Sequence, residues 1–181
     1  MRIIAGEARG RQIEAPSGRH TRPTLDRVRE NIFNMLQNDI PGSRVLDLFA
    51  GSGALSLEAI SRGAAFAVLV DSDRNACTVQ EKNIRTLGFE DRSRQFHCEW
   101  KKAVRELRKE NESFDIVFLD PPYAMTDMRE VFAELIPLTG PDSLVILEHE
   151  AGKSITVPNT YTLINERSWG FCAASYYRKM N

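Results

Sequence analysis

The four residues Asp120-Pro121-Pro122-Tyr123 directly follow the apolar run 114–119 and carry the most specific chemical signal in the chain. Two prolines fix the backbone and remove two amide donors, which leaves carbonyl oxygens as acceptors. The Asp120 carboxylate and a rigid carbonyl together offer two acceptors for the two hydrogens of one amino group. Tyr123 adds an aromatic face on which an extruded base can stack. We therefore predict that these four residues form a catalytic site that orients the exocyclic amino group of a nucleic-acid base.

A glycine-containing turn lies where an earlier apolar run gives way to a helical pattern. The run 45–49 leads into Gly51 and Gly53, and Asp71 ends the next apolar run. Glycines at such a point let the backbone approach a ligand, and a carboxylate after the following strand can bind a ribose diol. Ser56 replaces the third glycine of a dinucleotide fingerprint. The pattern favours S-adenosylmethionine, which has no pyrophosphate, over an unliganded structural turn.

The predicted cofactor site gathers residues from the ends of three successive apolar runs. Asp47 can supply negative charge for the cofactor's ammonium group, and Glu99 is in position to contact an adenine amino group. Glu99 is explained equally well as the acidic start of the following helix, favoured by the helix dipole. The predicted cofactor-binding residues are Asp47, Phe49, Ala50, Gly51, Gly53, Asp71, Ser72, Glu99 and Trp100.

Positive charge is concentrated at the beginning of a chain whose formal net charge is -1. Residues 1–29 contain seven arginines, no lysine and three acids, so this segment carries 7 − 3 = +4. The planar guanidinium suits phosphate oxygens better than the point charge of lysine. The segment is a candidate nucleic-acid-binding surface, and a solvated N-terminal arm is the alternative.

The elements that must position these residues alternate between strand and helix. Short apolar runs separated by helical periodicity indicate parallel strands buried on both faces. Two final runs without a helix between them indicate an antiparallel hairpin. We predict strands at 45–49, 66–70, 94–98, 114–119, 143–147, 161–167 and 171–178, helices at 25–36 (with Thr24 as N-cap), 54–60, 74–87, 99–109 and 128–136, and a small N-terminal hairpin of 2–4 and 11–13.

Cysteine usage and the N-terminus bear on the location of the protein in the cell. The three cysteines are widely spaced and include no Cys-x-x-Cys pair, which argues against a disulfide framework or a zinc site and favours a reducing cytoplasm. Charge at Glu7 and Arg9 interrupts any secretion signal, and no apolar run approaches the length of a membrane span. We expect a cytoplasmic monomer with no metal and no membrane association.

Taken together, the chain resembles the bacterial guanine-N2 methyltransferases of small-subunit (16S) ribosomal RNA. The similarity covers nearly the whole chain, and the segments before residue 31 are its specific part. The matching segments are Arg9-Gly10-Arg11, Thr21-Arg22-Pro23-Thr24, Asp26-Arg27-Val28-Arg29-Glu30, Phe33-Asn34, the run 46–55 and the C-terminal hairpin. Glu99 and Trp100 depart from the family, which more often has Asp or Asn and then a small residue.

The resemblance implies an α/β fold, the Rossmann-like S-adenosylmethionine methyltransferase fold, with a seven-stranded, mostly parallel sheet whose last strand is antiparallel. It implies methylation of the exocyclic N2 amino group of a guanine in 16S ribosomal RNA, with ribosomal RNA or a small-subunit assembly particle as partner. It also implies RNA contacts from the arginine-rich beginning, for which Arg9, Arg11, Arg22 and Arg27 are the candidates. We expect one methyltransferase domain over 1–181, with an RNA-binding hairpin-and-helix extension at 1–42 and a catalytic core at 43–181.

Three other functions share part of this pattern. An adenine-N6 methyltransferase of DNA uses an Asp-Pro-Pro-Tyr motif too, but such enzymes usually carry an added target-recognition domain for which this chain has no room. A glutamine methyltransferase of proteins favours Asn at position 120. An RNA-binding assembly factor without catalysis is the third alternative, although every predicted catalytic position is filled.

Overall fold

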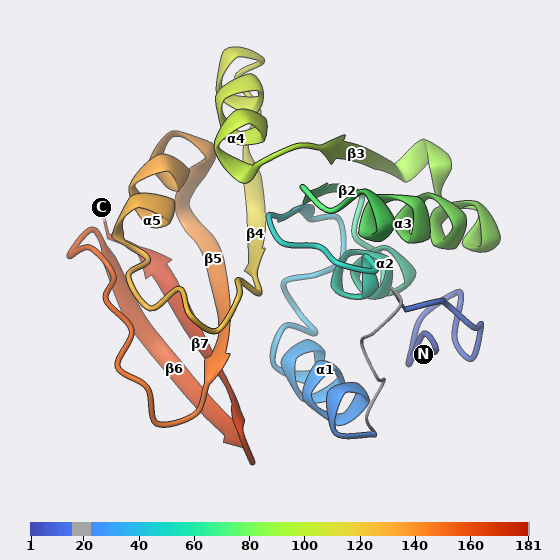
Figure 1. Ribbon diagram of the computed structural model, residues 1–181, viewed down its shortest axis with the longest axis horizontal. Helices are drawn as coiled ribbons and strands as arrows, with labels where there is room; N and C mark the ends of the chain where they lie inside the picture. Colours follow the sequence, from blue (N-terminus) through green and yellow to red (C-terminus); the bar gives the residue numbers. More distant parts are fainter. Residues whose placement is uncertain (16–22, 181) are drawn as a thin grey trace.

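The computed structural model of the chain describes residues 1–15 and 23–180, and a seven-stranded sheet lies at its centre (Figure 1). The strand order is β3-β2-β1-β4-β5-β7-β6. The pairs among β1 to β5 are parallel, and β7 is antiparallel to both of its neighbours. The predicted fold class is therefore confirmed. The strands are β1 Arg44–Asp47, β2 Phe66–Asp71, β3 Ser93–His97, β4 Phe114–Leu119, β5 Thr139–Glu150, β6 Tyr161–Trp169 and β7 Cys172–Lys179.

Helices cover both faces of this sheet (Figure 1). Consecutive residues of a central strand face opposite cores: Val45 packs with α1, α2 and α3, whereas Leu46 packs with α4 and α5. This double burial is the reason why the strands are continuous apolar runs. The helices are α1 Pro23–Met35, α2 Ala54–Ser61, α3 Arg74–Leu87, α4 Trp100–Lys109 and α5 Arg129–Leu135, with short 3-10 helices at Glu90–Arg92 and Ile136–Leu138.

Local sequence signals set the bounds of α3 but not those of the N-terminal elements. The Asp73 side chain caps α3 by accepting a hydrogen bond from the amide of Asn75 at 2.7 Å, and Gly88 ends the helix at a φ of 74°. The predicted N-terminal hairpin is present as a short antiparallel pairing, in which Arg2 and Gln12 form an isolated bridge. The Ile3 amide donates to the Arg11 carbonyl at 3.0 Å, and the Ile13 amide donates to the Met1 carbonyl at 2.9 Å. Helix α1 begins at Pro23, so Thr24 lies inside the helix rather than at its cap.

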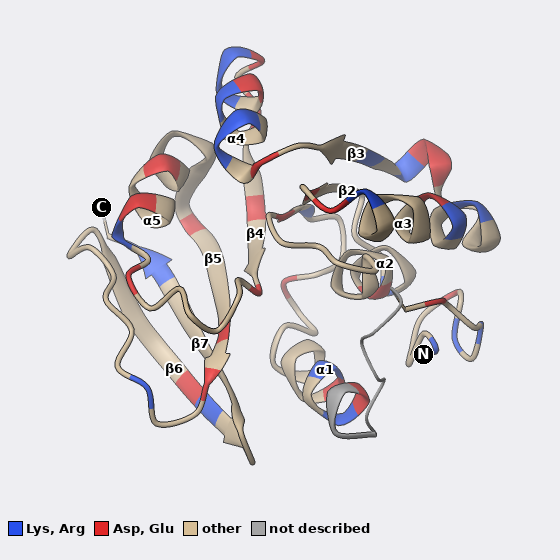
Figure 2. Cartoon of the chain, in the orientation of Figure 1, with Lys and Arg blue, Asp and Glu red and all other residues tan. Residues whose placement is uncertain are grey.

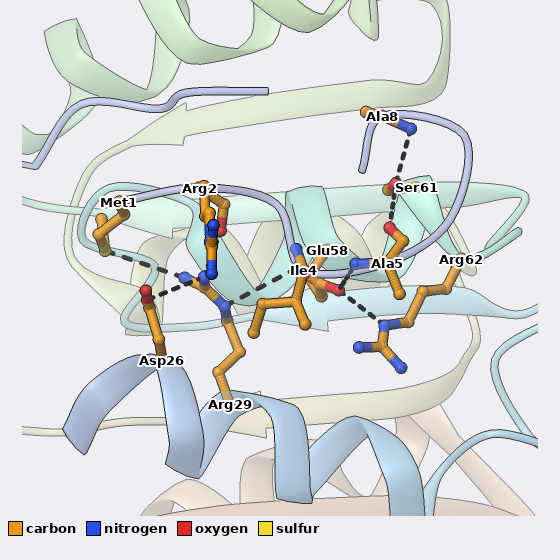
Figure 3. Close-up of polar contacts among 10 residues, drawn as sticks. All are labelled: Met1, Arg2, Ile4, Ala5, Ala8, Asp26, Arg29, Glu58, Ser61 and Arg62. Atoms are coloured by element: carbon orange, nitrogen blue, oxygen red, sulfur yellow. Dashed lines mark hydrogen bonds and ion pairs between the residues drawn. The ribbon is translucent and has the colours of Figure 1, made fainter. Parts of the chain in front are cut away.

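The segment 1–15 is fixed to helix α2 through a buried carboxylate (Figure 3). Glu58, which is fully buried, accepts hydrogen bonds from the amides of Ile4 and Ala5 at 2.8 and 3.0 Å. Its charge is balanced by Arg62 at 2.7 Å and Arg29 at 3.8 Å. Because an unpaired buried carboxylate would be costly, these contacts hold the segment in place. The alternative of a solvated arm is wrong for residues 1–15.

The anchored segment also approaches α2 more closely than a side chain would allow. A Cβ on Gly6 would lie 1.8 Å from the carbonyl oxygen of Ser61, and Gly6 has a φ of 83°. The Ser61 hydroxyl accepts a hydrogen bond from the amide of Ala8 at 3.0 Å and donates one to the Ala5 carbonyl at 2.6 Å. Only glycine fits at position 6, and the turn that it makes places the following arginines at the surface.

All three cysteines are free thiols. None of the helices in the described residues is long and apolar enough to cross a membrane. Within 1–15 and 23–180, no group of three His, Cys, Asp or Glu side chains is placed to hold a metal ion.

Candidate active site

The glycine turn and the Asp120 loop leave adjacent strands at the same edge of the sheet. Strands β1 and β4 are parallel neighbours in which Asp47 pairs with Phe118. Beyond the end of β1, the amide of Leu48 still donates to the carbonyl of Phe118 at 3.2 Å. The two motifs therefore begin within one strand spacing of each other. This is where open parallel sheets bind ligands, at the carboxyl ends of their strands.

The glycine turn is tied to the end of β2 by Asp71. One Asp71 carboxylate oxygen accepts from the amide of Gly51 at 2.8 Å, and the other accepts from the amide of Asp73 at 2.9 Å. Each oxygen keeps a further lone pair, so this half-buried carboxylate can still accept a hydroxyl. Gly53 has a φ of 80°, and a Cβ there would lie 2.7 Å from a methyl group of Leu69. The turn is thus fixed in a conformation that requires glycine.

Asp47 is the most deeply buried carboxylate of this turn. Its side chain is 1% exposed, and one oxygen accepts from the Ser56 hydroxyl at 3.0 Å. Within the described part of the chain, no hydrogen-bond donor satisfies the other oxygen, Oδ1. Burial raises the pKa of Asp47 to about 7, and the charge of Asp71 adds to that effect. An ammonium group at the turn would satisfy Oδ1 and favour the ionised carboxylate.

Two buried amide side chains of α3 support the turn, and the sequence analysis missed both. Gln80 donates to the Gly51 carbonyl at 2.9 Å, and Asn83 donates to the Ser52 carbonyl at 3.0 Å. Both side chains are almost completely buried. The signal was present in the sequence, because Gln80 and Asn83 occupy the inward stripe of α3 where apolar residues are expected.

Residues 120–123 form a more open structure at the end of β4. The Pro122 carbonyl accepts from the amide of Met125 at 2.8 Å, which closes a turn. Among the described residues, no donor reaches the Pro121 carbonyl. Asp120 is half-buried, and Tyr123 is 52% exposed. The acceptor pair that this geometry favours is thus the Asp120 carboxylate with the Pro121 carbonyl.

A half-buried acid near the end of β5 adjoins this loop. Glu148 shares with Pro121, Pro122 and Tyr123 a hollow of about 10 Å³, which is the size of one water molecule. The Cys172 thiol donates to Glu148 at 3.1 Å, and burial raises the pKa of Glu148. This hollow is too small to hold a base.

The remaining predicted cofactor residues follow the ends of β1, β2 and β3. Phe49 and Ala50 belong to the glycine turn, and Ser72 is exposed just beyond β2. Glu99 is exposed at the N-cap position of α4, and its side chain makes no capping hydrogen bond. Trp100, in contrast, is 8% exposed and packs in the core with α4 and α5, so its ring is part of the core.

The described N-terminal arginines differ in whether their guanidinium groups have partners within the protein. Arg29 is 5% exposed and its guanidinium donates to Asp26 at 3.1 Å. Arg11 donates to the carbonyl oxygens of Leu87 at 3.0 Å and of Thr86, at the end of α3. Both guanidinium groups are thus used within the protein, and Arg22 lies outside the described residues.

Comparison with known proteins gives the family. Residues 1–178 match the family model described as Conserved hypothetical protein 95. Ribosomal RNA small subunit methyltransferase D of Escherichia coli K12 is 36% identical, with 99% of this chain and 90% of that protein covered. The structure of a hypothetical protein from Thermus thermophilus is 31% identical, has a TM-score of 0.81 and covers 97% of this chain and 98% of its own.

A more distant structure shares the fold alone. It is a SAM-dependent methyltransferase from Agrobacterium tumefaciens, which is 16% identical, has a TM-score of 0.64 and covers 87% of this chain and 63% of its own. Its likeness supports the predicted type of fold, whereas the family assignment rests on the full-length matches. The chain therefore belongs to the family described as Conserved hypothetical protein 95, and the resemblance of its motifs to the small-subunit ribosomal RNA methyltransferases is confirmed.

Proposed function

We propose that the chain is an S-adenosylmethionine-dependent ribosomal RNA methyltransferase that modifies the exocyclic N2 amino group of a guanine in 16S ribosomal RNA. One observation carries this proposal: the hydrogen bond from Leu48 to Phe118, at 3.2 Å, joins the ends of the two strands that bear the glycine turn and the Asp120 loop. A cofactor on the first and an amino group on the second can therefore meet. The relative named ribosomal RNA small subunit methyltransferase D supports the type of substrate.

The residues of the glycine turn fit S-adenosylmethionine. The buried Asp47 Oδ1 has no donor among the described residues, which suits the ammonium group of the methionine end. Asp71 keeps lone pairs for the ribose hydroxyls, and exposed Glu99 can accept from the adenine amino group. When bound, the cofactor supplies an electrophilic methyl group. Because Oδ1 is covered in this conformation, binding through Asp47 requires a small opening of the turn 48–53.

Asp120 and the Pro121 carbonyl would hold the target amine. The lone pair of a base amino group is delocalised into the ring, so the group is a weak nucleophile. Two acceptors that engage both N–H bonds localise that lone pair and orient it, and the carboxylate can accept the released proton. Positioning and preorganised electrostatics are then the main catalytic contributions. Tyr123 is exposed enough to stack on the extruded base.

For the RNA partner we propose contacts by Arg9 and Arg27, whose side chains are exposed. Arg11 is better explained as a cap on the carbonyl groups of α3, because its guanidinium is engaged there. Arg22 remains a candidate from the sequence. We further propose that 1–42 is an RNA-binding extension of a single domain whose catalytic core is 43–181, and that the enzyme is a cytoplasmic monomer acting on ribosomal RNA or on an assembling small subunit.

The test is transfer of a labelled methyl group to RNA. The purified protein is incubated with methyl-labelled S-adenosylmethionine and small-subunit ribosomal RNA, either naked or in assembled particles. The RNA is then digested to nucleosides, which are separated against standards. We expect N2-methylguanosine with wild type and none with Asp120→Ala. Label in N6-methyladenosine would replace guanine by adenine as the target. Bound RNA without any transfer would favour the non-catalytic assembly factor.

A further inference from the structure

A hollow of about 890 Å³ lies at the surface between the N-terminal segment, the start of α1 and the turn that joins β6 to β7. Three of its lining residues are arginines that are exposed: Arg2, Arg9 and Arg27. Trp169 lines it from β6. The hollow is separate from the glycine turn, so the cofactor site does not account for it.

The charge of this hollow is positive. Among the residues whose side chains are described, 1–15 and 26–180, the guanidinium groups of Arg2, Arg9 and Arg27 make neither a hydrogen bond nor an ion pair. Of the two acids in the lining, Asp26 is already paired with Arg29 at 3.1 Å, which leaves Glu30 as the opposing charge. Three uncommitted guanidinium groups on one concave surface are suited to the phosphates of a nucleic acid.

The anchoring of the N-terminal segment explains why two of these arginines are held at the hollow. Arg2 and Arg9 flank the residues that are bonded to Glu58 and Ser61, and the Arg2 carbonyl accepts from the buried Arg29 at 2.5 Å (Figure 3). The segment is thus positioned by buried contacts while these two side chains stay exposed. Preorganisation of this kind reduces the entropy that binding would otherwise cost.

Two aromatic residues flank Gly170 at the β6–β7 turn: Trp169, which lines the hollow, and Phe171, which follows Gly170 in the chain. Trp169 is partly buried against the core, Gly170 makes the turn at a φ of 63°, and Phe171 is 87% exposed. A phenylalanine with that exposure contributes almost nothing to folding, because it removes little apolar surface from water. In basic surroundings, an exposed aromatic ring offers a stacking platform for an unpaired base.

This turn is continuous with the catalytic edge of the sheet. The amide of Ala151 donates to the Phe171 carbonyl at 2.9 Å, and Cys172 contacts Glu148, which lies beside the Asp120 loop. An RNA strand at the hollow would therefore run toward the amine-binding residues. Figure 1 shows the β6–β7 turn and helix α1 at the same end of the molecule.

We infer that the hollow and the β6–β7 turn bind the unpaired RNA segment next to the target nucleotide. Arg2, Arg9 and Arg27 contact its phosphates, and Trp169 and Phe171 stack on its bases. This inference rests on the proposed function, because it concerns how the same enzyme holds its RNA. It commits to single-stranded RNA, since stacking needs bases that are free of a duplex.

The first experiment removes the charges. Binding of a fluorescein-labelled, single-stranded 20-nucleotide RNA of mixed sequence is measured at several salt concentrations, with wild type and with the triple variant Arg2→Gln, Arg9→Gln, Arg27→Gln. Each lost phosphate contact lowers the slope of log K against log salt by about 0.7, so the expected reduction is about 2. The matched control is Arg105→Gln, an exposed arginine of the basic helix α4, which runs away from this edge (Figure 2). An unchanged slope in the triple variant would overturn the inference.

The second experiment removes the stacking surface. Phe171→Ala should weaken single-stranded RNA binding roughly 5- to 150-fold, with an unchanged salt slope and little effect on a duplex RNA of the same length. Phe171→Tyr should bind RNA as wild type does, because stacking on a base requires an aromatic ring. A purely apolar contact would not have this requirement. The control is Leu163→Ala, because Leu163 is 49% exposed on β6 away from the turn.

Measurements of cofactor affinity and of methyl transfer distinguish failure of the RNA-binding inference from failure of the proposed function. All of these variants should bind S-adenosylhomocysteine as wild type does. If wild type transfers methyl groups to RNA but Phe171→Ala binds RNA normally, the inference fails and the proposed function stands. If wild type transfers no methyl group, the proposed function fails. Loss of binding to partly assembled small subunits without loss of RNA affinity would assign the hollow to a protein partner and overturn the inference.

Discussion

The glycine turn and the Asp120 loop lie side by side but are built in opposite ways. The turn is held by side chains of neighbouring elements: Asp71 binds the Gly51 amide at 2.8 Å, and Gln80 binds the Gly51 carbonyl at 2.9 Å. In the loop, one main-chain bond, from Met125 to Pro122 at 2.8 Å, closes the turn, and Tyr123 is 52% exposed. Buried hydrogen bonds fix the first, whereas proline rings stiffen the second.

This difference suits two different ligands. A small cofactor can be enclosed, so its site gains from buried polar groups that are already oriented. A base that belongs to a polymer has to be extruded and brought in from outside, so its site stays open. Prolines keep the acceptor carbonyl in place without a surrounding network that would block entry. Substitutions on the two sides should therefore affect different measurements.

The largest effect on a measured property is expected for a substitution in the Asp120 loop. Asp120→Ala should lower turnover roughly 10²- to 10³-fold, because one preorganised partner of the amine is lost. Affinity for S-adenosylhomocysteine, measured by calorimetry, should remain within about twofold of wild type. Asp120→Asn keeps one carbonyl acceptor and should recover part of the rate. If Asp120→Ala weakens cofactor binding as strongly as it slows turnover, the glycine turn and the Asp120 loop do not act as separate binding sites.

The next effect tests the burial of Asp47. Its pKa of about 7 in the folded protein lies above the ordinary value of 3.8, so its contribution to stability is complete below pH 3.8 and is lost as pH rises to about 7. Asp47→Asn does not titrate. Between pH 5 and pH 8, the free energy of unfolding of wild type should therefore fall by about 3 kcal/mol relative to the variant.

Urea unfolding of both proteins without cofactor, at several pH values, measures this difference. A constant difference from pH 5 to pH 8 would show that Asp47 is ionised throughout and that the turn is more solvated than the structure indicates.

The smallest of the three effects concerns the tie between β1 and β2. Asp71→Ala removes the acceptor for the Gly51 amide and the proposed acceptor for the ribose, and it should weaken cofactor binding by about 1.5–3 kcal/mol, roughly 10- to 150-fold. The matched control is Asp73→Ala, which removes the nearby cap of α3 and should cost about 1 kcal/mol of stability while affinity is kept. Equal losses of affinity in both variants would point to general disorder of the region instead.

Much of the site could be predicted from the sequence because strand ends, glycine turns and prolines act locally. The bounds of α3 and β4 agree with the prediction, and the Asp120 and Gly51 motifs follow the strands that were expected to carry them. Gln80 and Asn83 were missed because helical periodicity identifies an inward stripe but not what faces it. The pairing of the N-terminal hairpin was predicted, but its contacts with α2 were not, because α2 lies far along the chain.

The sequence by itself determined the order of the elements, the residues at the strand ends and the family. These features depend on backbone preferences and on the alternation of apolar residues, both of which can be recognised within short segments of the sequence. Only the tertiary structure decided which arginines have partners within the protein: Arg29 is buried beside Glu58, and the exposed Arg11 binds the end of α3, whereas Arg2, Arg9 and Arg27 line the hollow. Identical side chains differ in this respect because a guanidinium group is committed by the partners that the fold brings to it, and those partners come from distant parts of the chain.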